Sequence, residues 1–227
     1  MTEIERGPEQ FEGARVAGLG EKTVSGIFWT SLTEAGEQSL RFAIAVILAR
    51  LLVPEDFGLL AMVMVFARLA RLLPTMGFGM ALIQKQDVEP RHLSSVFWLS
   101  LITGMLLTLT VAFCSPLIAN FYGQPALVPI TVAVSLTFII ESSGAVQSSL
   151  LLKSMDFRRL AMIRITALTI AGAASVAMAL SGFGIWSLVA NSLLIAGFTA
   201  ALLWYLSDWK PELSNCWLWT VRSGVNW

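Results

Sequence analysis

Six charged side chains lie well inside long apolar segments, away from the segment ends, where a charge is costly. They are Glu34, Glu37, Arg41, Arg68, Arg71 and Glu141. Arginine suits phosphate because its planar guanidinium can donate two parallel hydrogen bonds. A nearby carboxylate can hold a proton or a sodium ion. These residue types therefore fit either buried structural ion pairs or a cavity that receives an anionic substrate.

Five of these charges fall at a similar depth when each apolar segment is laid across a membrane. They are Glu37, Arg41, Arg68, Arg71 and Glu141. A charge at the centre of a membrane helix costs about 2.5–3.5 kcal/mol, so five unpaired charges would cost on the order of 15 kcal/mol. This cost excludes exposure to lipid, and we expect the charges to face one another or water.

The spacing predicts how the charges are shared. Glu37 and Arg41 are four residues apart on one helix and can pair. Arg68 and Arg71 are three apart and point to one helix face, where either could pair with Glu141. In one interpretation these are structural pairs, and in the other the arginines line a water-filled cavity. The spacing alone does not choose between them.

The segment that carries Arg68 and Arg71 also contains residues that loosen a helix. Pro74 follows Arg71 by one turn and removes a backbone hydrogen bond, which permits a kink. Gly77 and Gly79 follow in the same half of the segment. We therefore predict that Pro74, Gly77 and Gly79 act in gating.

The elements that must position these residues are long apolar helices. Hydrophobic residues make up 56% of the chain and charged residues 13%, and the mean hydropathy is +0.73. A hydrocarbon core about 30 Å thick requires roughly 20 apolar residues per helix. The fold class is therefore all-α, a polytopic membrane bundle. Its six expected spans are 24–52, 57–83, 94–119, 127–151, 160–181 and 185–205.

Lysine and arginine fall on alternate connections between these spans. The amino-terminal lead, the second and fourth connections and the final tail are basic, whereas the other connections contain only Arg50, at a helix end. The positive-inside rule places the basic segments in the cytoplasm. We predict a cytoplasmic lead over 1–23, a six-helix lobe over 24–206 and a cytoplasmic tail over 207–227.

Other classes of site find no support in the residue types. Cys114 and Cys216 are expected on opposite sides of the membrane and cannot pair within one chain. His92 is the sole histidine and lies in an inner loop. No spacing is typical of a metal site or a catalytic constellation, so we expect no metal, no cofactor and no enzyme. The net charge of zero gives no indication of a nucleic-acid partner.

The chain resembles bacterial polysaccharide transporters, the O-antigen, colanic-acid and exopolysaccharide flippases of the multidrug/oligosaccharidyl-lipid/polysaccharide exporter superfamily. The strongest match is residues 48–59, LARLLVPEDFGL. Further matches follow in order over roughly 26–211. They are residues 77–79 with 81–84, 97–98, 116–119 with 121–122, 156–158, 182–189 and 209–211.

The resemblance implies a flippase for surface polysaccharide, such as lipopolysaccharide or exopolysaccharide, in the bacterial inner membrane. Members move a polyprenyl-pyrophosphate-linked oligosaccharide by alternating access, through a cationic cavity between two six-helix lobes. Arg41, Arg68 and Arg71 become candidates for binding the anionic headgroup. Glu34, Glu37 and Glu141 become candidates for charge pairing or for coupling to a proton or sodium ion.

The chain departs from the family in holding only the first lobe. We interpret it as a fragment, a frameshifted product or a half-transporter that needs a second lobe or a dimer partner, with polysaccharide assembly proteins as further partners. The alternatives are a drug or small-molecule antiporter of the same superfamily and a non-transporting assembly partner. A membrane-embedded sugar or acyl transferase is a further class, which no residue pattern supports.

Overall fold

The computed structural model describes residues 34–75, 90–154 and 156–207. These residues form seven helices and no strand. The first helix covers 34–51 of the described residues. The others are α2 (Pro54–Thr75), α4 (Pro90–Phe113), α5 (Ser115–Tyr122), α6 (Leu127–Lys153), α7 (Phe157–Leu180) and α8 (Ile185–Leu206).

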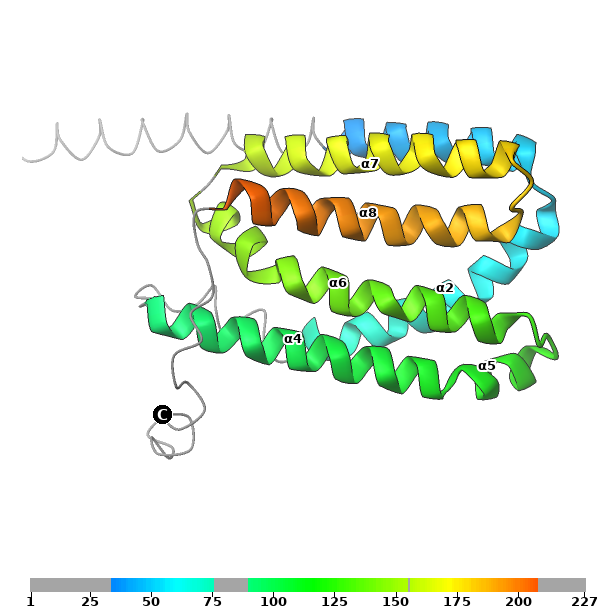
Figure 1. Cartoon of the computed structure of the whole chain (residues 1–227), viewed down its shortest axis with the longest axis horizontal. Helices are drawn as coiled ribbons and strands as arrows, with labels where there is room; N and C mark the ends of the chain where they lie inside the picture. Colours follow the sequence, from blue (N-terminus) through cyan, green and yellow to red (C-terminus); the bar gives the residue numbers. More distant parts are fainter. Residues whose placement is uncertain (1–33, 76–89, 155, 208–227) are drawn as a thin grey trace, which may run out of the picture.

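The long helices lie side by side, with α6 between α4 and α8 and with α7 on the far side of α8 (Figure 1). The first helix runs beside α7, and Ile44 and Leu48 pack in one buried cluster with Leu168 of α7. Helix α2 crosses behind α6, where Val63 and Ala67 share a second buried cluster with Val134 and Phe138. The bundle has two ends. The end where α6 stops and α7 starts is the predicted cytoplasmic one.

Local sequence sets the helix ends. Pro54 begins α2, where its missing N–H costs nothing, and Glu55 and Asp56 follow in the positively polarised first turn. Asp156 caps α7 by accepting a hydrogen bond from the backbone N–H of Arg159 at 3.2 Å. Gly182 and Gly184 join α7 to α8 with φ of 82° and 52°, a region that favours glycine.

The prediction of one continuous helix over 94–119 is wrong, because the chain turns at Cys114 between α4 and α5. Pro116 has no N–H to donate to the carbonyl of Ala112, one turn earlier. The hydroxyl of Ser115 donates to that carbonyl instead, at 2.7 Å. The connection between the expected spans 94–119 and 127–151 is also shorter, since α5 continues to Tyr122 and Gly123 ends it with φ 66°.

The interior of the bundle holds small polar residues among its apolar ones, and the exterior is apolar. Thr131, Ser135, Ser175 and Ser187 are completely buried. Large apolar side chains cover the exterior, including Phe42, Leu106, Phe113, Leu117 and Tyr205. Small polar residues let membrane helices approach closely, and an apolar exterior suits lipid. The predicted class, a multi-pass helical membrane bundle, is confirmed.

Four helices are long and apolar enough to cross a membrane by length and composition. They are α6, α7, α8 and the stretch Val96–Phe113 of α4. The first helix and α2 continue towards residues outside the described ranges, so the count of six spans stays a prediction. The predicted lead over 1–23 and nearly all of the tail over 207–227 also lie outside those ranges.

The contact between α4 and α6 depends on a missing side chain. Gly104 of α4 lies so close to α6 that a Cβ there would be 2.6 Å from Cβ of Ser142 and 3.0 Å from the backbone oxygen of Phe138. One turn on, the hydroxyl of Thr108 lies 3.0 Å from the backbone oxygen of Ser135, to which it donates across the same interface. Close backbone approach and one interhelical hydrogen bond therefore hold α4 to α6.

We expect Gly104→Ala to destabilise the bundle by about 1–3 kcal/mol, because relieving the overlap requires the two backbones to separate. The matched control is Gly197→Ala on α8, where an added Cβ would meet nothing within 4 Å. Thermal unfolding in detergent measures both variants. Equal or higher stability of Gly104→Ala would show that this close approach is unimportant.

Candidate functional site

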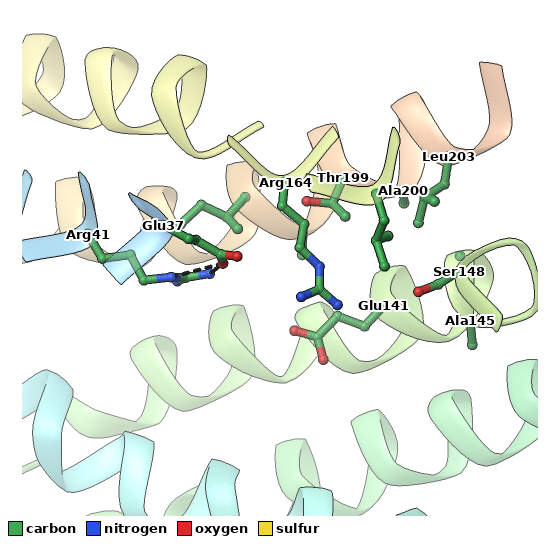
Figure 2. A pocket seen from close by; sticks show the side chains of 13 residues that line it. Glu37, Arg41, Glu141, Ala145, Ser148, Arg164, Thr199, Ala200 and Leu203 are labelled. Atoms are coloured by element: carbon green, nitrogen blue, oxygen red, sulfur yellow. Dashed lines mark hydrogen bonds and ion pairs between the residues drawn. The ribbon is translucent and has the colours of Figure 1, made fainter. Parts of the chain in front are cut away.

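A pocket of about 340 Å³ lies between the first helix, α6, α7 and α8. Charged residues of three helices line it. They are Glu37 and Arg41 of the first helix, Glu141 of α6 and Arg164 of α7 (Figure 2). The remaining wall is mixed in character, with small and polar residues such as Ser148 of α6 and Thr199 of α8, and with the aliphatic side chains of Leu160, Ile195 and Leu203. The bundle therefore gathers charges around one hollow.

The pocket reaches from the predicted cytoplasmic end, near Leu160 of α7 and Leu203 of α8, into the apolar helices. Glu141 is twelve residues before the end of α6, which corresponds to about 18 Å at 1.5 Å per residue. Arg164 is seven residues after the start of α7, which corresponds to about 10 Å from the same end of the bundle. Both residues therefore lie well inside the apolar helices, nearer to the predicted cytoplasmic end.

Glu37 and Arg41 form the predicted pair within the first helix. Nη2 of Arg41 donates to Oε1 of Glu37 at 2.6 Å, and Nε donates to the same oxygen at 3.2 Å. Oε2 of Glu37 is buried and has no hydrogen-bond partner among the described residues. One oxygen of this carboxylate thus accepts two hydrogen bonds, while the other is buried without a hydrogen-bond partner among the described residues.

Arg71 and Glu141 form a second pair, which joins α2 to α6. Nη2 of Arg71 donates to Oε1 of Glu141 at 2.8 Å, although the residues are 70 positions apart in the chain. The Arg71 guanidinium carbon also lies 5.6 Å from the centre of the Phe138 ring, in a cation–π arrangement. The sequence left either Arg68 or Arg71 as the partner of Glu141, and in the structure that partner is Arg71.

Arg164 joins the site although its sequence position did not indicate it. It follows the basic fourth connection, so from the sequence it is expected only to help set the orientation of the chain in the membrane. In the bundle it lines the pocket, and its guanidinium points towards Glu141 (Figure 2). Its ion pair is with Glu34 of the first helix at 3.6 Å. Only the packing of α7 against the first helix brings these two residues together.

Arg68 and Arg71 do not line this pocket with Arg41. Arg68 lies on the exposed side of α2 and makes no ion pair with any described residue. Arg71 reaches the site only through Glu141. Pro74 lies in the last turn of α2, and its side chain is outside the described part. Gly77 and Gly79 also lie outside the described residues.

The arrangement suits binding of ions better than making or breaking bonds. Guanidinium groups of Arg41 and Arg164 supply several donors, and the free oxygen of Glu37 supplies an acceptor. Within the described residues, no cluster of three or more His, Cys, Asp or Glu could hold a metal. The pocket can therefore hold a small anion by its arginines, or a proton or monovalent cation by a carboxylate.

Known relatives are similar over most of the chain. It is 31% identical over 86% of its length to a succinoglycan biosynthesis transport protein, ExoT, of Rhizobium meliloti, covering 40% of that protein. It is 29% identical over 66% of its length to a lipopolysaccharide biosynthesis protein, WzxC, of Escherichia coli, covering 30% of it. It is 29% identical over 85% of its length to a teichuronic acid biosynthesis protein, TuaB, of Bacillus subtilis, covering 40% of it.

The chain thus spans less than half the length of the curated relatives that it matches. No solved structure matches it significantly. The profile of one family, described as polysaccharide biosynthesis protein, matches residues 47–218. The chain therefore belongs to this polysaccharide biosynthesis family, which confirms the resemblance of its motifs to those of bacterial polysaccharide transporters.

Proposed function

We propose that this chain forms one lobe of a polysaccharide exporter in the bacterial cytoplasmic membrane, with both termini in the cytoplasm. The substrate is a polyprenyl-pyrophosphate-linked oligosaccharide, and it crosses the membrane by alternating access. The relatives named for succinoglycan transport and for lipopolysaccharide and teichuronic acid biosynthesis support the substrate class. The second lobe is either a further segment of the same protein or a partner protein.

The observation that carries this proposal is an arginine-containing pocket at membrane depth in a bundle with an apolar exterior. Charged residues in a membrane are expensive, so they mark substrate or ion pathways unless they serve structure alone. A volume of about 340 Å³ is at the low end for ligand pockets. It suits a compact anionic headgroup, and the sugar chain would extend outside it.

Arg41 is the residue that we assign to the headgroup. It lines the pocket, and its side chain is 45% exposed, so its guanidinium can take a second partner beside Glu37. We place Arg68 differently, facing the water-filled space between the two lobes, because an exposed arginine on lipid would be costly. Arg71 supports the site from outside by holding Glu141.

Glu37 is the residue that we assign to coupling. Its buried Oε2 lacks a hydrogen-bond partner among the described residues, while Oε1 stays bound to Arg41. A proton or a sodium ion could occupy Oε2 without breaking that pair. Glu34 and Glu141 pair instead with arginines of other helices, Arg164 of α7 and Arg71 of α2. Coupling would then act within one helix turn of the headgroup site.

We expect Arg41→Ala in the full natural protein to abolish export while the protein still inserts. Losing hydrogen bonds to a charged group costs about 1.5–3 kcal/mol, which is roughly 10- to 100-fold in affinity. Surface polysaccharide and membrane-fraction protein are measured together. The control is Arg50→Ala, an exposed arginine at the other end of the same helix. Normal surface polysaccharide in Arg41→Ala would contradict the proposal.

The pair between Arg71 and Glu141 is expected to be structural. Arg71→Met leaves Glu141 without its partner and should lower the unfolding temperature, whereas Arg71→Met with Glu141→Leu should recover it. We expect export to recover together with stability in the double variant. A double variant that is stable but does not export would assign a transport role to these two side chains.

Glu37→Gln tests coupling separately from binding. The amide oxygen can still accept from Arg41, but the side chain no longer carries a charge that a proton or cation can neutralise. We expect exchange of lipid-linked substrate across vesicles to continue while export driven by an ion gradient is lost. Gradient-driven export at the wild-type rate would remove Glu37 from the coupling step.

A further inference from the structure

The charged groups of the pocket and their direct partners are balanced. Three arginines meet three carboxylates, in the pairs Arg41–Glu37, Arg71–Glu141 and Arg164–Glu34. Among the described residues, an anion that enters this network therefore meets arginines that already pair with a carboxylate. It can become a second partner, as proposed for Arg41, or replace a carboxylate, and replacement is easiest at the weakest pair.

The pair between Arg164 and Glu34 is the weakest of the three by geometry. Its nearest atoms are 3.6 Å apart, against 2.6 Å and 2.8 Å in the others. Arg164 makes no side-chain hydrogen bond to any described residue, so its donors are not saturated. Glu34 is also the most exposed of the three carboxylates, at 63%. Exposed, loosely held ion pairs contribute little.

Arg164 is also well placed for an anion. It lines the pocket from α7, whereas Arg41 lines it from the first helix, so the two guanidinium groups approach the same hollow from different helices (Figure 2). Each planar guanidinium can bind phosphate with two parallel, charge-assisted hydrogen bonds, which are stronger than an exposed ion pair. Two such groups match the two phosphates of a pyrophosphate.

We propose that Arg164 is a second headgroup residue, and that Glu34 is a competing carboxylate which Arg164 releases when pyrophosphate binds. This inference rests on the proposed function and adds a residue and an exchange of partners to it. Because Glu34 belongs to the first helix and Arg164 to α7, the exchange also breaks a link between these two helices.

The test is binding of inorganic pyrophosphate to the full natural protein in nanodiscs of zwitterionic lipid. We expect Arg164→Gln to weaken binding about 10- to 100-fold, because it removes charge-assisted bonds. Glu34→Gln should strengthen binding by about 2- to 5-fold, because it removes the competitor. The double variant should bind like Arg164→Gln alone. Arg164→Lys keeps the charge but loses the planar guanidinium with its two parallel donors, so its affinity for pyrophosphate should lie between those of the wild type and Arg164→Gln.

The matched control is Arg158→Gln, which removes one exposed arginine from the same helix outside the pocket. It should bind pyrophosphate like the wild type. Unfolding temperatures in the same nanodiscs show whether any variant has lost its fold. If Arg164→Gln has lost its fold, pyrophosphate binding by Arg164→Lys is compared with that of the wild type instead. Wild-type affinity in Arg164→Gln, no gain in Glu34→Gln, or no binding by the wild-type protein would each overturn the inference.

Two further measurements separate the alternatives. In the first, an anionic phospholipid is added to the nanodiscs to test whether the pocket prefers a bilayer phosphodiester. If this lipid displaces pyrophosphate from the wild-type protein but not from Arg164→Gln, the assignment of Arg164 to pyrophosphate is wrong. Export is measured on the same variants. Export lost in Arg41→Ala with unchanged pyrophosphate binding in Arg164→Gln would refute this inference alone. Normal export in Arg41→Ala would refute the proposed function.

Discussion

Charge compensation inside an apolar bundle is the constraint on which the site depends. A charged side chain among membrane helices costs about 2.5–3.5 kcal/mol unless it finds a partner or water. Six charged side chains of the described helices meet this requirement in three ion pairs, and Arg68 is placed against water instead. One lies within the first helix, one joins α2 to α6 and one joins the first helix to α7. The pocket is where these pairs converge, so the same charges hold the helices and shape the hollow.

The bundle around the pocket is held by small and polar contacts. Gly104 brings α4 against α6, and the Ser175 hydroxyl donates to the side-chain oxygen of Asn191, joining α7 to α8 at 3.0 Å. Trp204 of α8 donates from its indole N–H to the backbone oxygen of Ser143 on α6, also at 3.0 Å. Such links fix α6, α7 and α8 relative to one another. The first helix carries both Glu37 and Glu34. Among the described residues, its polar link to α7 is the loose ion pair between Glu34 and Arg164.

Much of this fold could be predicted from the sequence because lipid imposes simple rules. Apolar length predicted the helices, although α2 begins at Pro54, three residues before the expected start of its span at 57. The pair of Glu37 with Arg41 follows from helical spacing alone. The break at Cys114 could not be predicted from hydropathy. Pro116 lies inside an apolar segment, and a proline there is compatible with either a kink or a break.

The composition of the site was less predictable, because it depends on tertiary packing. The choice of Arg71 over Arg68 for Glu141 depends on how α2 crosses α6. Arg164 looked like one more charge beside a basic connection, as Arg158 and Arg159 do. The one signal in the sequence that sets it apart is its position, four residues inside the expected span 160–181.

The central claim is that the pocket is water-filled and receives an anionic headgroup. The most direct test is labelling of Ser148→Cys by a hydrophilic thiol reagent, in a protein whose native cysteines are replaced by serine. Ile165→Cys, on the exposed side of α7, serves as the lipid-facing reference. The account predicts fast labelling at position 148, slow labelling at position 165 and protection of position 148 by pyrophosphate. Equal, slow labelling at both positions would contradict it.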